Sequence, residues 1–360
     1  MKGIGKILAT GCVIFTIAGC NHQSGPLSQE EKHIVTELTE NLKTRCVGRY
    51  LIDLPEDATE SGYATIGGVY IETKAMTEDA YRQEVSQREA QLKATKSIDA
   101  YPFLYSAENA PAREARYFIH RGTVYSDPAT RQIEAYKWER GYRISLKVET
   151  FDYTHPDQTN DVLVQKMTVK NKLPEKVRVV LTLLEKLRGR PKEEIPSEPG
   201  VCFAGGFFPS AASGDQYVGS GFRLANNRDI SFDLSVDTEP QGNTTLLQRI
   251  ESPEVRATYK AADSRVIRKG IVDQPGLKAE EWLIETRRPG GGRGDLFALT
   301  VNETSSGPSS PYLSLDMYTG GQLLIQGKFV KLDTGSLSTG EAVALWDAVS
   351  RTVRIRPGAF

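Results

Sequence analysis

Thr-Arg-Cys-Val-Gly-Arg-Tyr-Leu-Ile-Asp-Leu-Pro, residues 44–55, is the stretch where the folded part of the chain is expected to begin. Val47, Tyr50 and Leu54 are β-branched, aromatic and aliphatic side chains, which suit the half-buried surface of a β-strand. Pro55 has no backbone N–H with which to continue a hydrogen-bond ladder, so the strand is predicted to end there.

A looser copy of this stretch recurs at residues 201–209, Val-Cys-Phe-Ala-Gly-Gly-Phe-Phe-Pro, where Cys202 follows Cys46 after 156 positions. Each copy places glycine before aromatic residues and a closing proline. Two helical patterns also correspond at an offset of 165, namely Val177, Val180, Leu181 and Leu184 with Ala342, Leu345, Trp346 and Val349. These correspondences predict an internal duplication, with two α+β domains of similar topology, each an antiparallel sheet packed with helices.

Hydrophobic periodicity predicts the elements of each domain. Period-two alternation or β-rich composition indicates further strands at 68–74, 114–120, 132–138, 142–151, 230–236, 281–286, 296–301 and 312–318. Helical spacing and capping residues indicate helices that begin near Ser28, Thr77, Pro174, Thr244 and Ser338, the fourth of them broken near Pro253.

The amino terminus has the layout of a secretory signal peptide, with an apolar run at residues 7–18 that is too short to span a bilayer. The ending Ile-Ala-Gly-Cys at residues 17–20 resembles a bacterial lipobox, which predicts cleavage before Cys20 and acylation of its thiol. The alternative is a plain signal peptide with an incidental cysteine. Several acyl chains would make a stable anchor. Asn21, rather than Asp, follows the cysteine, and its resemblance to the sorting signals of enterobacteria-like cells implies the periplasmic leaflet of the outer membrane.

The expected organisation is a signal peptide at residues 1–19 and a lipidated, tethered segment with a short helix at 20–43, of which 21–33 read as a flexible tether. An N-terminal α+β domain at 44–192 and a C-terminal α+β domain at 201–360 then flank a linker at 193–200. Pro196 and Pro199 stiffen that linker. Two domains joined in this way could grip one partner from two sides.

No catalytic or cofactor motif is present in the sequence. It has no Gly-x-Ser-x-Gly elbow, no His-Glu-x-x-His, no phosphate loop and no cysteine pair with metal spacing, and its four histidines are scattered. The 45 basic residues balance 46 acidic residues, which argues against a nucleic-acid partner. We therefore expect no catalytic residue, no metal and no cofactor.

Cys46 and Cys202 are the only thiols left for an intrachain disulfide once Cys20 is acylated, because Cys12 lies in the signal peptide. An oxidising compartment permits that bond. The alternative is two buried reduced cysteines, one in each core.

Two stretches are candidates for a partner-binding surface. The first is the glycine-rich loop at residues 287–295, whose Arg287, Arg288 and Arg293 could make bidentate contacts with carboxylates, beside Asp295. Its alternative role is a solvated hairpin loop. The second is residues 205–217, in which Phe207, Phe208 and Tyr217 fit either a core or a contact surface.

The motifs Cys-Val-Gly-Arg-Tyr-Leu-Ile-Asp-Leu-Pro at 46–55 and Val-Cys-Phe-Ala-Gly-Gly-Phe at 201–207 resemble those of immunity lipoproteins that neutralise lipase effectors of bacterial type VI secretion systems. The resemblance covers most of the mature chain. It does not identify any binding residue in this sequence. It implies a non-catalytic protein on the periplasmic side of the outer membrane that binds a lipase or phospholipase effector. It would inhibit the enzyme by clamping its lid or covering its active-site entrance.

Two other classes of function fit the same features. An envelope lipoprotein with a structural or assembly role would share the anchor and the missing catalytic motifs. A hydrolase with an unfamiliar site is the third reading, since the absence of a motif is weak evidence. A neighbouring gene that encodes a protein with a Gly-x-Ser-x-Gly elbow would favour the inhibitor.

Overall fold

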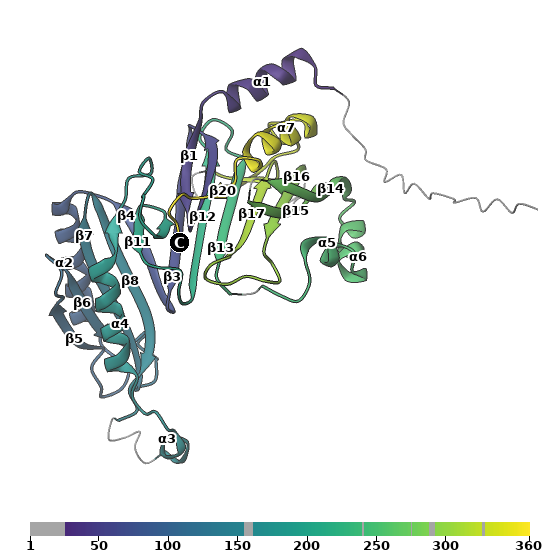
Figure 1. Ribbon diagram of the computed structural model, residues 1–360. Helices are drawn as coiled ribbons and strands as arrows, with labels where there is room; N and C mark the ends of the chain where they lie inside the picture. Colours follow the sequence, from purple (N-terminus) through teal and green to yellow (C-terminus); the bar gives the residue numbers. More distant parts are fainter. Residues whose placement is uncertain (1–25, 155–160, 240, 275, 288–291, 326–327) are drawn as a thin grey trace, which may run out of the picture.

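The computed structural model describes residues 26–154, 161–239, 241–274, 276–287, 292–325 and 328–360. A single antiparallel sheet of twelve strands runs through both halves of the chain (Figure 1). In hydrogen-bonded order its strands are β14 (Arg265–Gln274), β15 (Leu277–Arg287), β16 (Arg293–Val301), β17 (Tyr312–Tyr318), β13 (Ser231–Asp237), β12 (Gln216–Leu224), β3 (Ala58–Ile66), β4 (Val69–Ala75), β8 (Tyr142–Phe151), β7 (Thr130–Glu139), β6 (Arg116–His120) and β5 (Leu104–Asn109).

The two halves contain the same elements in the same order. Each begins with two hairpins and continues with a helical segment, four strands, a helix and a short final strand. The N-terminal half has β1 (Leu42–Val47), β2 (Tyr50–Pro55), β3, β4, α2 (Glu78–Ala94), β5 to β8, α4 (Leu173–Lys186) and β9 (Arg188–Gly189). The C-terminal half has β10 (Gly200–Phe203), β11 (Gly206–Pro209), β12, β13, α5 (Leu246–Ile250), α6 (Pro253–Ala261), β14 to β17, α7 (Thr339–Ser350) and β20 (Arg354–Ile355). The predicted α+β architecture with two domains of similar topology is confirmed.

Four elements stand outside this repeat: α1 (Gln29–Thr39), α3 (Val162–Lys166), β18 (Gln322–Ile325) and β19 (Lys328–Lys331). None of the described helices is long and apolar enough to cross a bilayer.

The order of the strands reveals a pseudo-two-fold axis. From the centre outward, β12, β13, β17, β16, β15 and β14 correspond to β3, β4, β8, β7, β6 and β5. The axis passes between β3 and β12, which pair along their whole length, with Gly62 opposite Ser220. The two halves therefore share one continuous sheet.

The opening stretch at residues 44–55 forms a hairpin, so the prediction of one strand was wrong. Val47 pairs with Tyr50 across a turn at Gly48, whose φ of +58° lies in the left-handed region that glycine adopts without strain. Pro55 ends β2 as expected. The copy at residues 201–209 is likewise a hairpin, in which Phe203 pairs with Gly206.

The two hairpins meet at the axis, where Gly48 and Cys202 exchange both backbone hydrogen bonds, at 2.7 and 2.9 Å. Cys46 and Cys202 form a disulfide with a Cα–Cα distance of 5.7 Å. Of the two alternatives open to the sequence, the structure thus has the covalent bridge between the halves.

Each half also gives its last strand to the other half. The N-terminal β9 pairs with β11, and the C-terminal β20 pairs with β2. A repeated Arg-x-Arg-Pro sequence, at 188–191 and 354–357, carries both exchanged strands. The halves are interlocked, and the linker at 193–200 runs beside the interlock.

The second arginine of each Arg-x-Arg-Pro sequence, Arg190 or Arg356, is 1% exposed and binds backbone carbonyls. Arg356 donates to the carbonyls of Glu198 and Gly200 at 2.9 and 2.8 Å, and Arg190 donates to that of Phe203 at 3.1 Å. Burial lowers the pKa of both guanidiniums. These hydrogen bonds hold the exchanged strands in place. Because both side chains are buried from solvent, water could not replace the hydrogen bonds if they were lost.

One face of the sheet carries the main core. The hairpins, α4 and α7 cover this face with a continuous apolar cluster that spans both halves. In the C-terminal half, for example, Trp346 of α7 meets Phe297 of β16 edge-on, with ring centroids 5.9 Å apart. On the opposite face, hydrophobic clusters cover only the two ends of the sheet, so the central strands have no hydrophobic cover there.

The helix starts follow the predicted caps. Ser28, Thr77 and Ser338 each accept a backbone hydrogen bond at the N-cap, and α5 ends just before α6 starts at Pro253. The tether predicted at 21–33 overlaps α1, so the structure contradicts its last five residues. The Ser338 hydroxyl donates to Glu31 at 2.8 Å, which fixes α1 on the start of α7.

Candidate partner-binding face

We use the name open face for the side of the twelve-stranded sheet that lies opposite the hairpins, α4 and α7. The helix α2 covers the end formed by β5, β6 and β7, and α5 with α6 covers the end formed by β15 and β16. The six strands between them, β17, β13, β12, β3, β4 and β8, present side chains to solvent. This stretch of the open face, here called the central strip, crosses the pseudo-two-fold axis.

Three tyrosines from three neighbouring strands cluster at the middle of the central strip. The ring of Tyr63 on β3 lies 5.1 Å from that of Tyr70 on β4 and 5.5 Å from that of Tyr217 on β12. Tyr63 and Tyr70 are each 37% exposed, and burial raises the pKa of Tyr217 to about 12. Neutral, part-exposed tyrosines combine apolar area with a polar tip, a character that is enriched at protein interfaces.

Two glycines of β12 accommodate neighbouring side chains of the central strip. Gly219 stands opposite Tyr63, and Gly221 stands opposite Ser61. A Cβ added at Gly219 would lie 3.1 Å from the Tyr217 hydroxyl, and one at Gly221 would lie 3.1 Å from Asp233 Oδ1. The glycines therefore make room for the Tyr217 ring and the Asp233 carboxylate to lie against the backbone of β12.

Two aspartates face each other on the same strip. Asp233 on β13 is directly opposite Asp316 on β17, and the Ser314 hydroxyl donates to Asp316 Oδ2 at 3.2 Å. Burial raises the pKa of both carboxyls, that of Asp316 to about 6. Like charges at opposed positions repel each other, so a cation brought by a partner would relieve the cost of ionising this pair.

The three aromatic candidates occupy different environments. Phe207 is fully buried in a cluster with the disulfide, and Phe208, 8% exposed, belongs to the main core. Tyr217 alone reaches the open face. The sequence could not separate these roles, because each residue precedes or follows glycine-rich backbone without alternation.

In the glycine-rich loop at residues 287–295, the described arginines form ion pairs within the protein. Arg293 binds Asp263 at 3.0 Å and Glu285 at 3.0 Å, and Arg287 lies 4.0 Å from Asp263. Asp295 is 3% exposed and accepts a hydrogen bond from Thr319, and burial raises its pKa to about 6. Arg288 and Cys20 lie outside the described residues. Of the two described arginines of this loop, Arg287 is the more exposed, with 68% of its side chain accessible against 40% for Arg293.

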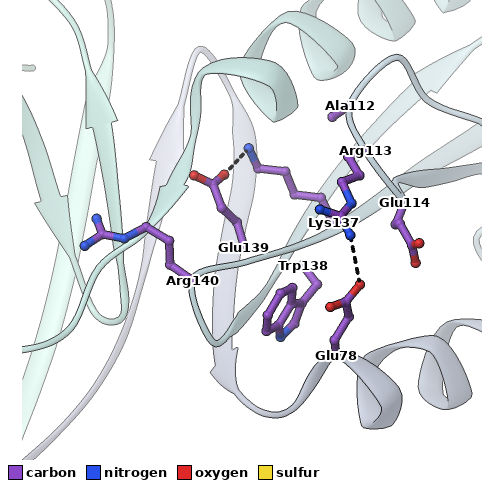
Figure 2. A pocket seen from close by; sticks show the side chains of 8 residues that line it. All are labelled: Glu78, Ala112, Arg113, Glu114, Lys137, Trp138, Glu139 and Arg140. Carbon is purple, nitrogen blue, oxygen red and sulfur yellow. Dashed lines mark ion pairs between the residues drawn. The ribbon is translucent and has the colours of Figure 1, made fainter.

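A pocket of about 240 Å³ lies at the end of β7, close to the start of α2. Figure 2 shows the side chains that line it. Trp138 forms part of its wall, Lys137 Nζ pairs with Glu139 at 2.7 Å, and Arg113 lies 3.8 Å from Glu78. These opposite charges satisfy one another within the pocket. Among the described residues, no group of three or more His, Cys, Asp or Glu side chains could hold a metal ion.

Solved structures that share this fold include a two-protein complex and an immunity protein determined with and without a peptide. A crystal structure of a Tle4–Tli4 complex aligns with a TM-score of 0.69 and 21% identity, over 89% of this chain and 99% of that chain. The apo structure of the T6SS immunity protein TplEi from Pseudomonas aeruginosa aligns with a TM-score of 0.66 and 21% identity, over 88% and 98%. The same protein in complex with an "L" peptide gives 0.62 and 20%, over 89% and 99%.

No curated protein is similar enough to this chain to count as a match. The family model of the Tle cognate immunity protein 4 N-terminal domain, however, matches residues 43–190, and the C-terminal domain model of that family matches residues 194–358. The two models follow each other in the expected order and together take in both halves of the interlocked fold. The chain therefore belongs to the Tle cognate immunity protein 4 family.

Proposed function

We propose that this protein is an immunity protein that binds a lipase effector of a type VI secretion system and inhibits it by contact along the central strip. Two observations support the proposal. Both halves match an immunity-protein family, and the central strip is left uncovered where the two halves join. Membership of an immunity family favours binding over catalysis. The T6SS and Tle4–Tli4 relatives supply the class of partner.

The central strip has the properties of a hot spot. Tyr63, Tyr70 and Tyr217 give rigid aromatic area at its middle, and the Asp233–Asp316 pair lies on the same face within the C-terminal half. Aromatic anchors supply much of the energy of protein interfaces, whereas unpaired charges set orientation and specificity. An effector surface with an exposed apolar segment and a nearby arginine or lysine would complement this strip.

The inhibition we infer is steric. A lipase has to expose an apolar active site to reach its substrate, commonly through movement of a lid. Helix α2 at one end and α5 with α6 at the other flank the central strip, so a segment of the effector held there would be confined between two walls. Holding a lid, or covering the entrance beneath it, stops catalysis without chemistry from the inhibitor.

We also propose that acylated Cys20 anchors the protein to the periplasmic leaflet of the outer membrane. Because α1 is fastened to α7 by the Glu31–Ser338 hydrogen bond, the tether is shorter than the sequence predicts. The eight residue-to-residue steps from Cys20 to the N-cap at Ser28 would span roughly 25–30 Å when fully extended. That distance keeps the folded body close to the lipid that a lipase attacks.

Binding tests the proposal directly. Calorimetry of the purified effector with the Tyr63→Ala/Tyr217→Ala protein should show a loss of at least 30-fold in affinity, about 2 kcal/mol. Tyr125→Ala is the matched control, since Tyr125 is 77% exposed in a turn beyond β6, away from the central strip. An unchanged affinity in the double variant would exclude the strip as the binding site.

A genetic experiment tests the function separately. Deleting the gene in a strain that keeps the cognate effector should make cells sensitive to attack by their siblings, and complementation should restore survival. The double tyrosine variant, expressed at the same level, should fail to protect. Normal survival of the deletion strain with an active effector would exclude the immunity function.

A further inference from the structure

A second cavity, of about 390 Å³, lies beneath α6 at the β14 edge of the sheet. Trp282 and Ile284 of β15 and Tyr259 of α6 contribute its apolar surface. The volume lies within the usual range for small-molecule sites. This cavity is remote from the tyrosine cluster in the order of strands, because β16, β17 and β13 separate β15 from β12.

One residue that lines the cavity carries a buried donor without an acceptor. Trp282 is 5% exposed, and its indole N–H has no hydrogen-bond partner among the described residues. Tyr259 packs edge-on against its ring at a centroid distance of 4.4 Å. A buried N–H that binds nothing costs free energy, and an acceptor delivered by a ligand would recover that cost.

The rim of the cavity is cationic. Arg256, Lys260 and Lys269 line it together with a single acid, Glu251. Glu251 is shared between Arg256 and Lys269 in two ion pairs, and no ion pair involves Lys260 in the described part of the chain. The excess of positive charge favours an anionic ligand, and Lys260 is the cation free to receive it.

Two exposed apolar side chains lie along the edge strand on either side of Lys269. Val266, which lines the cavity, is 48% exposed, and Ile271, further along β14, is 57% exposed. On β15, the alternate residues Glu280, Trp282 and Ile284 point to the open face. Val266 pairs with Ile284 and Ile271 pairs with Glu280, so both of these side chains also lie on the open face. A chain of several methylene groups could lie along these two side chains and the methylene stem of Lys269 between them.

We propose that this cavity binds a free aliphatic carboxylate of the fatty-acid class. The carboxylate lies between Lys260 and the indole N–H of Trp282, and the aliphatic chain crosses Val266 toward Ile271. The site is distinct from the central strip, so it goes beyond inhibition of an effector. Hydrolysis of ester lipids is the class of reaction that supplies such a ligand.

Tryptophan fluorescence and calorimetry test the site in the full chain carrying Cys20→Ser, prepared without detergent. Decanoate, below its micelle concentration, should bind one to one and change the emission of Trp282. Acetate has the head group alone, and decyltrimethylammonium has the same chain with a cationic head. Each of these should bind at least ten-fold more weakly.

Two variants assign the contacts. Lys260→Glu should weaken decanoate binding at least ten-fold, whereas Lys278→Glu, an exposed lysine outside the cavity, should leave it unchanged. Trp282→Phe keeps an aromatic ring but removes the N–H, and should weaken binding several-fold and abolish the emission change. Because Lys260 is exposed, its variant keeps the fold and remains informative if Trp282→Phe fails to fold.

Three results would overturn the assignment: equal affinity for decanoate and decyltrimethylammonium, undiminished binding by Lys260→Glu, or binding only to vesicles of phosphatidylglycerol. The last result would identify a bilayer surface as the ligand. Retained affinity of Lys260→Glu for the effector would show that this site and the central strip are independent.

Discussion

Replacing both bridged cysteines, as Cys46→Ala with Cys202→Ala, should cost about 5 kcal/mol of unfolding free energy. The bridge closes a loop of 156 residues in the unfolded chain. In the chain-entropy account a loop of that length restricts the unfolded state by about 5 kcal/mol at 25 °C. Leu51 and Phe207 pack around the sulfurs, so the loss of two sulfur atoms also weakens a small apolar cluster.

Urea unfolding of the Cys20→Ser chain, with and without the double substitution, measures this cost. Adding dithiothreitol should lower the midpoint of the bridged protein to that of the double variant and should leave the double variant unchanged. Because the sheet is continuous across both halves, fluorescence and circular dichroism should report the same transition. A loss below about 1 kcal/mol would refute the chain-entropy account of this disulfide.

Three further predictions concern the buried carboxyl of Asp316, the exchanged strands and the buried guanidinium of Arg356. Burial raises the pKa of Asp316 to about 6, so the folded state binds its proton more tightly than the unfolded state, whose pKa is about 3.9. Its stabilisation is complete below pH 4 and is lost as pH rises through 6. Asp316→Asn should therefore raise the melting temperature at pH 8 but not at pH 4, and an equal effect at both would contradict the shift. Residues 44–192 and 201–360, expressed separately, should not fold as native monomers, because each lacks the partner of its exchanged strand; a cooperative native-like melt of either half would refute the interlock. Arg356→Ala should cost roughly 3 kcal/mol, measured by urea unfolding, because buried carbonyls lose charged donors, while Arg228→Ala on the surface should change little.

The sequence predicts those strands that have one apolar and one polar face. β13 and β17 alternate strictly because one face meets the core and the other meets solvent, and their predicted positions are confirmed within one residue. β3 and β12 escaped prediction because glycine and serine occupy their paired positions at the axis, where the two backbones approach closely. β5 and the edge strand β14 also escaped, since neither buries a regular stripe.

The candidate site was less accessible to sequence reasoning. Tyr217 was identified, but Tyr63 and Tyr70 were not, because they meet only through the pairing of β12, β3 and β4. The repeated Arg-x-Arg-Pro sequence was the missed signal for strand exchange. It recurs at an offset close to that of the helices α4 and α7, and a search for short repeats would have found it.

The interlock changes the physical account of how two domains would hold one partner. Domains joined by a linker gain affinity through effective concentration, which depends on linker length. Here a shared sheet, a disulfide and two exchanged strands join the halves, and Arg356 binds the linker carbonyl of Glu198. The span between α2 and α5 with α6 is therefore fixed before the partner arrives. Affinity then derives from preorganisation, since little conformational freedom is lost on binding.

Lengthening the linker at 193–200 should consequently leave effector affinity almost unchanged, whereas removing the disulfide should lower it. The opposite pattern in calorimetry would show that the halves act as tethered, independent modules.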